Sequence, residues 1–187
     1  MKKEKALDPL RLDVATLARD GAPMDGQWRV EELTRLAQAC VTPADDGALE
    51  PVRWAAQGEQ RSRPPGEAQL WLHLQASGSV WLQCQRCLQP VHTELEVDRS
   101  FRFVRSEAEA EAEDLDSEEE VLALPRTLDL RGLVEDELIL ALPLVPRHEE
   151  CPEPLPMPSA DLPEEAPAPE ANPFAKLAVL KRGKPSN

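Results

Sequence analysis

Apolar and polar residues alternate along the middle of the chain. Apolar side chains occupy every second position of residues 70–84, with a break at Gly78, and recur with the same period in residues 91–103. A shorter alternating stretch covers residues 52–56. Strict alternation is typical of strands that bury one face. Because only the short stretch CQRCLQP (84–90) joins the two long segments, they predict an antiparallel β-hairpin.

Two other segments have helical spacing. Apolar residues recur every three or four positions in residues 28–40 and again in residues 129–142. Pro43 and Pro143 follow these segments, and Asp129 is suited to cap the second one. The sequence therefore predicts an α+β fold, with an antiparallel sheet of four to six strands and two main helices at about 28–40 and 129–142.

Charge divides the chain further. The 187 residues carry a net charge of −14, but residues 106–120 hold nine acids and residues 149–170 hold seven, with no Lys or Arg in either segment. Without those sixteen charges the net charge becomes +2. Segments this acidic bury too little apolar area to offset the cost of ordering, so we expect a flexible acidic insertion at 106–120.

The same reasoning gives the domain organisation. We expect one α+β domain over residues 1–148 and a disordered, acidic, proline-rich linker over 149–171. Residues 172–187 then form a short basic helix and tail, because Asn172 followed by Pro173 is a helix-start signal.

Several classes of protein are disfavoured by the sequence. The basic start is not followed by an apolar stretch of signal-peptide length, and no segment is apolar for the ~18–20 residues that a membrane span needs. We therefore expect a cytoplasmic protein without a membrane partner. Nucleophile-elbow, P-loop and dinucleotide-binding patterns are also missing. We expect no enzymatic activity and no small-molecule substrate.

Cysteines supply the sharpest local feature. Cys84 and Cys87 have the CxxC spacing that can chelate one metal ion from a single turn, and His148 and Cys151 offer a second half-site. Zinc is the candidate ion for such a set, and no other cofactor is expected. Two alternatives stay open, a pair of reduced structural thiols and a redox pair. Cys40 lies on an apolar helix face and is expected in the core.

Three segments together carry a family resemblance. CQRCLQP (84–90), DLRGLVEDELILALPLVPRHEEC (129–151) and NPFAKLAVLKR (172–182) resemble the YceD family, the large ribosomal RNA subunit accumulation proteins. The positions that match the family motif are Cys84, Arg86, Cys87, Pro90, Asp129, Glu135, Glu137, Leu138, Pro143 and Pro146. Distant members have a second cysteine pair in the later segment, where this chain has Cys151 with His148 nearby.

The resemblance implies a role in large ribosomal subunit biogenesis, through the synthesis, processing or stability of 23S ribosomal RNA. The expected partner is then 23S RNA or a precursor of the large subunit. The candidate contact residues are basic, and they are Arg86, Arg99, Arg102, Arg105, Lys176, Lys181 and Arg182. The alternative is an acidic adaptor that binds a basic large-subunit ribosomal protein, with an indirect effect on the RNA.

Overall fold

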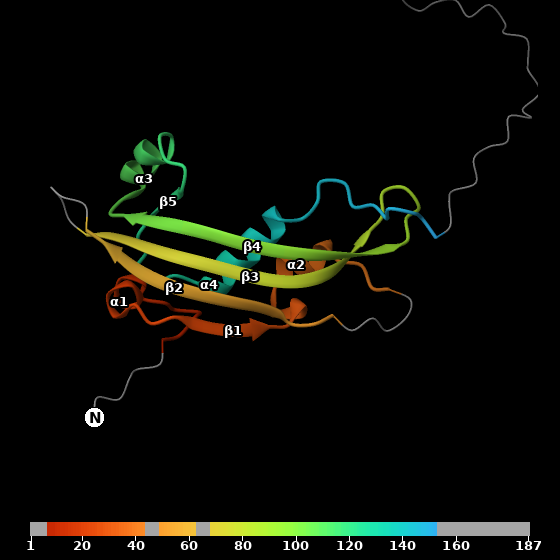
Figure 1. The fold of residues 1–187 in the computed structure, drawn as a ribbon, viewed down its shortest axis with the longest axis horizontal. Coiled ribbons are helices and arrows are strands. Elements are labelled where there is room, and N and C mark those ends of the chain that lie inside the picture. The colour runs from red at the N-terminus through yellow and green to blue at the C-terminus, as the bar shows by residue number, and fades with distance from the viewer. Residues whose placement is uncertain (1–6, 44–48, 63–67, 153–187) are drawn as a thin grey trace, which may run out of the picture. The chain divides into compact units, whose positions relative to one another are not determined.

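The computed structural model describes residues 7–43, 49–62 and 68–152. In this part of the chain five strands form one sheet in the order β1-β2-β3-β4-β5. The first four strands pair antiparallel, and β5 pairs parallel to β4. Figure 1 shows the sheet in front of α2 and α4, which cover its far face. The predicted α+β class is confirmed.

The long hairpin organises the sheet. β3 (Gln69–Gln83) and β4 (Pro90–Val104) pair continuously, from Leu70 opposite Phe103 to Gln83 opposite Pro90. β2 (Val52–Arg61) pairs with the other side of β3. Gly78 does not interrupt β3. A side chain at this position would come within 2.9 Å of a Val52 methyl group. The absence of a side chain at this position therefore leaves room for Val52 of the neighbouring strand.

One face of the sheet, the helical face, holds the core. It is covered by α1 (Val14–Asp20), α2 (Thr34–Ala39) and α4 (Leu130–Leu140). α1 lies so close to β2 that a methyl group on Gly58 would sit 2.5 Å from the backbone of Ala18. The largest fully buried side chains include Phe101, Leu12, Leu17, Leu33, Leu36, Leu72, Leu74, Leu130 and Leu138. The opposite face, the open face, carries the polar members of the alternation.

The prediction of a helix at about 28–40 is wrong in its first half. β1 (Met24–Trp28) takes the start of this segment, a single 3-10 turn, η1 (Val30–Glu32), follows, and α2 is only six residues long. Trp28 stacks on Trp54 with ring centroids 4.7 Å apart, across the pairing of β1 with β2. This long-range pairing overrides the local helical pattern, although the apolar positions that defined the pattern still point into the core.

The prediction of an acidic loop at 106–120 also needs correction. Residues of this segment form α3 (Glu107–Asp114) and the start of β5 (Glu120–Ala123). The Ser106 hydroxyl accepts a hydrogen bond from the backbone of Glu109 at 3.3 Å and caps the helix. A small apolar cluster of Val104, Ala110 and Val121 anchors α3 to the end of the hairpin. The acids are therefore displayed on a helix.

The second helix follows its prediction closely. α4 begins after Asp129, whose carboxylate accepts a hydrogen bond from the backbone of Gly132 at 3.1 Å, and it ends just before Pro143. None of the helices in the described residues is long and apolar enough to cross a membrane. The predicted linker beyond residue 152 and the basic helix at 172–187 lie outside the described residues.

Candidate metal centre

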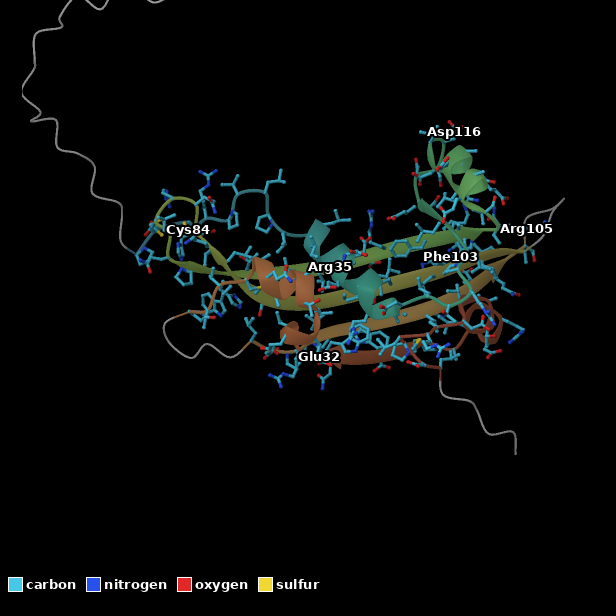
Figure 2. All side chains as sticks on the ribbon, turned by 180° about the vertical axis from the view of Figure 1, so that it is seen from behind. Glu32, Arg35, Cys84, Phe103, Arg105 and Asp116 are labelled. Carbon is cyan, nitrogen blue, oxygen red and sulfur yellow. The ribbon has the colours of Figure 1, made fainter. Side chains whose placement is uncertain are left out.

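The turn between β3 and β4 presents two thiols to the same point. The backbone N–H of Cys84 donates to the Gln89 carbonyl at 2.9 Å, and that of Leu88 donates to the Cys84 carbonyl at 2.9 Å. Leu88 has a φ of 63°, a conformation uncommon for leucine that closes the turn. Cys84 and Cys87 are consequently buried, at 0% and 5% exposed. Figure 2 shows Cys84 at one end of the hairpin, opposite the end that carries Arg105 and Asp116.

The chain that follows α4 is tied to this turn. The backbone of Gln85 donates to the Pro146 carbonyl at 2.9 Å. Arg86 donates to the carbonyls of His148 and Glu149 at 3.0 and 3.1 Å, and its Nε lies 3.0 Å from the Cys151 sulfur. Arg86 therefore positions the second half-site against the first.

The four predicted metal ligands converge. The ligand atoms of Cys84, Cys87, His148 and Cys151 all lie within 4.8 Å of one another. The sulfurs of Cys84 and Cys151 are 3.9 Å apart, and the Cys87 sulfur is 3.4 Å from Nδ1 of His148. In a tetrahedral zinc site with Zn–S bonds of about 2.3 Å, neighbouring sulfurs lie about 3.8 Å apart. The group therefore has the composition and spacing of a Cys3His metal site.

The histidine is oriented for ligation. Nε2 of His148 lies 2.9 Å from the Pro90 carbonyl oxygen. A carbonyl can only accept, so Nε2 carries the proton and, in the neutral ring, Nδ1 keeps its lone pair toward the sulfurs. Fixing a ligand histidine through its other nitrogen is the usual outer-shell arrangement in metal proteins.

The thiols have unequal acidity. Burial raises the pKa of Cys84, but hydrogen bonds from the backbone N–H groups of Cys87, Arg86 and His148 outweigh it and lower the pKa to about 5. Burial raises the pKa of Cys87 above its ordinary value. The pKa of the Arg86 guanidinium is raised by its contact with Cys151. The turn thus stabilises a thiolate at Cys84, and the thiolate is the form that binds metals.

Of the three sequence interpretations, the geometry favours metal binding. Redox CxxC pairs are activated at a helix N-terminus, whereas Cys84 and Cys87 lie in a turn between strands. Cys40 is separate from the group: its thiol donates to the Leu36 carbonyl within α2 at 3.2 Å, and burial raises its pKa. Three cysteines and one histidine can supply all four ligands of a tetrahedral metal ion and leave no position for water or substrate. This is typical of a structural site rather than a catalytic one.

The other candidate contact arginines lie on the second half of the hairpin. Arg99 pairs with Glu137 at 3.3 Å and with Glu120 at 3.6 Å. Arg102 is 9% exposed and pairs with Glu113 on α3. The backbone N–H of Arg105 donates a hydrogen bond to the Glu109 carboxylate at 3.1 Å. Lys176, Lys181 and Arg182 lie outside the described residues. The side chains of Arg99 and Arg102 thus form ion pairs with glutamates of the same domain.

The family-motif residue Glu135 has a role that the sequence did not reveal. Its carboxylate accepts from the backbone N–H of Arg35 at 2.6 Å and of Leu36 at 3.2 Å, and it pairs with the Arg35 side chain at 2.9 Å. Arg35 also pairs with Asp136, and Figure 2 places it where α2 meets α4. One buried carboxylate therefore caps α2 from a position 100 residues away. No local pattern could have indicated this pairing.

Comparison with known proteins agrees with the motifs. The family model described as "Large ribosomal RNA subunit accumulation protein YceD" matches residues 72–181. A curated protein of Haemophilus influenzae with that same name is 33% identical over 189 residues, which cover 96% of this chain and 99% of the relative. No solved structure matches. The chain therefore belongs to the YceD family.

Proposed function

We propose that this protein is a non-enzymatic, cytoplasmic factor that supports the synthesis, processing or stability of 23S ribosomal RNA during assembly of the large ribosomal subunit. The observation that carries the proposal is the similarity over nearly the whole chain to a protein named for large ribosomal RNA subunit accumulation. The match includes both halves of the Cys3His group and the helix that holds Glu135 and Glu137.

The use of the buried acids supports a non-catalytic role. Glu135 and Glu137 are 6% and 5% exposed. Glu135 caps α2, and Glu137 pairs with Arg99. They lie two residues apart on α4, so their side chains point to different sides of the helix and do not converge on one open cavity, as a general acid and base must. The contacts that these two glutamates make from α4 to α2 and to β4 explain their place in the motif without a catalytic role.

Deletion of the gene in its bacterial host tests the proposal. We expect a lower ratio of 23S to 16S RNA in total RNA, restored by the wild-type chain expressed in trans. A purified-protein assay for RNA cleavage, run on 23S transcripts, should show no turnover. An unchanged ratio in the deletion strain, or cleavage that survives repurification, would contradict the proposal.

A protein partner is the second candidate target, and the disposition of charge favours it over direct RNA contact. Arg86, Arg99 and Arg102 are engaged within the fold. The acids of α3 are displayed at one end of the sheet, and among its first residues Glu107 and Glu111 are exposed. Because carboxylates repel phosphates and attract basic side chains, such a surface suits a basic large-subunit ribosomal protein. Removal of ribosomal proteins from affinity-purified complexes decides between the two: RNA that stays bound supports direct contact.

We propose zinc as the ion of the Cys3His group. Three thiolates and an imidazole are ligands that zinc prefers in structural sites. The distances between Cys84 and Cys151 and between Cys87 and His148 are those expected for neighbouring ligands of a tetrahedral zinc ion. Protein purified under reducing conditions without chelators should contain about one zinc ion per chain. Cys84→Ser should remove most of it, while Cys40→Ser, the matched control just after α2, should retain it. Less than about 0.2 zinc per chain in the wild-type protein, even after reconstitution, would refute this assignment.

A further inference from the structure

The outer edge of β4 is only partly paired. β5 pairs with Phe101–Val104 alone, so within the described residues the remaining stretch, 91–100, has a neighbouring strand only on the β3 side. Figure 1 shows β5 confined to one end of β4. We call residues 91–100 the β4 edge. A free edge of this length presents a row of backbone N–H and C=O groups that can pair with another extended chain.

Three acids line this edge on the open face. Glu94, Glu96 and Asp98 occupy alternate positions of β4, so their side chains project from the same face. Their register partners in β3 are neutral: a glutamine at 75 and serines at 77 and 79. Asp98 accepts a hydrogen bond from Gln75 at 3.1 Å. Among the described residues none of the three acids has an ion-pair partner.

The helical side of the edge holds a pocket. A cavity of about 370 Å³ lies between the edge and the end of α4, and its lining residues are Glu96, Val97, Asp98, Arg99, Glu137, Leu140 and Ala141. Leu140 is 73% exposed there. Arg99 forms ion pairs with both Glu137 and Glu120. Burial, together with the negative charge of Glu120, raises the pKa of Glu137.

We infer that the β4 edge binds an extended basic segment of a partner protein, which adds to the sheet as a further strand. Side chains of an added strand alternate between the two faces. Every second residue would lie about 5 Å from Glu94, Glu96 or Asp98, where Lys or Arg is favoured. The intervening residues would lie on the helical side, where apolar side chains can contact Leu140. The pattern expected in the partner is thus basic and apolar residues in alternation.

RNA is a poorer occupant of the same edge. Its phosphates would face the three unpaired carboxylates, which repel them. A nucleic acid also lacks the regular array of amide donors and acceptors that pairs with a strand edge. This inference deepens the protein-partner candidate, and it does not require the effect on 23S RNA, so the two can fail separately.

A heptapeptide of alternating lysine and valine, with blocked ends, is a suitable probe for the full-length protein. Its matched control carries an N-methyl group on every amide, which keeps the charge but removes the N–H donors of both peptide edges and so prevents strand pairing. We expect N-methylation to weaken binding by at least about tenfold, because the peptide is held by backbone hydrogen bonds as well as charge. The unmodified peptide should also slow amide exchange in residues 91–100 and leave β1, the other edge of the sheet, unchanged.

Charge variants locate the binding surface. The double variant Glu96→Lys, Asp98→Lys should weaken binding of the heptapeptide by about tenfold in moderate salt. The double variant Glu107→Lys, Glu111→Lys makes the same charge change on the exposed face of α3 and should alter binding less than about twofold. Circular dichroism checks that both variants are folded.

Three results would overturn the inference. Equal binding of the methylated peptide would show attraction by charge alone. Equal loss in the two double variants would place the peptide elsewhere on the acidic surface. Protection of residues 91–100 by a single-stranded oligouridylate, with none by the peptide, would assign the edge to RNA. A normal 23S to 16S ratio in the deletion strain would leave the peptide result standing and would contradict only the proposed function.

Discussion

Replacement of Glu135 by alanine should destabilise the protein through α2, although Glu135 lies in α4. The carboxylate accepts two backbone N–H groups at the start of α2, from Arg35 and from Leu36. Leu36 is fully buried, so its N–H group has no access to water once the acceptor is removed. The Arg35 side chain is half exposed and keeps its second partner, Asp136. The main loss is therefore the cap and not the ion pair.

The magnitude follows from these contacts. Loss of a helix N-cap costs about 0.5–2 kcal/mol, and a buried N–H group left without a partner costs about 1–3 kcal/mol. The half-exposed ion pair adds less than about 1 kcal/mol. Because the first two contributions overlap, we expect the free energy of unfolding to fall by about 3 kcal/mol in Glu135→Ala. Asp136→Asn, which removes only the exposed partner of Arg35, should cost less than about 1 kcal/mol.

Urea unfolding of the full chain, followed by tryptophan fluorescence at constant zinc concentration, measures both variants. The pH dependence gives a second test. Burial raises the pKa of Glu135, but the N–H groups of Leu36 and Arg35 and the Arg35 guanidinium together lower it below its ordinary 4.5. The contribution of the charged form to stability is therefore complete above pH 4.5 and is lost as the pH falls through the lowered value. The stability difference between the wild type and Glu135→Gln should shrink below pH 4.5.

Two results would refute this reasoning. One is an equal loss of stability in Glu135→Ala and Asp136→Asn, since it would mean that the backbone cap contributes nothing. The other is a stability difference for Glu135→Gln that stays constant from neutral pH to pH 3, since the lowered pKa requires it to decline.

The remaining predictions concern the metal centre and the packing of α1. Arg86→Ala should weaken zinc retention about 10–100-fold in competition with a chelator, because Arg86 positions the segment with two of the ligands; retention equal to the wild type contradicts that role. Zinc removal by a chelator should speed amide exchange at 147–151 while α1 stays protected; uniform protection would show that the metal does not order this segment. Gly58→Ala should lower the free energy of unfolding by about 1–3 kcal/mol, because α1 must move, and an unchanged urea midpoint contradicts the close packing.

Much of the fold was predictable because its strongest elements carry local signals. The β3–β4 hairpin follows from alternation that continues over its full length, and α4 follows from its apolar period, its Asp129 cap and Pro143. The CxxC spacing, with a His and a Cys beyond α4, indicated all four members of the Cys3His group. In each case the residues that determine the structure are close in sequence or of a distinctive type.

Most of the incorrect predictions concern elements whose structure is determined by contacts between residues that are far apart in the sequence. Trp28 belongs to a strand because β2 offers it Trp54 to stack on. α3 is different: the Ser106 cap is a local helix-start signal that the acidic composition outweighed in the prediction, and Ala110 packs against Val104 and Val121. The pairing of Glu135 with Arg35 and the burial of Arg102 depend on which helix and strand meet in space. Such contacts leave no periodic trace in the sequence.

Pulse-labelling of newly made RNA after rapid depletion of the protein is the most direct test of the central claim, a role in 23S RNA accumulation. The account predicts that label in mature 23S RNA falls within the first generation, while label in 16S RNA and the growth rate are still unchanged. A parallel decline of both RNAs, or a loss of 23S label only after growth has slowed, would contradict it.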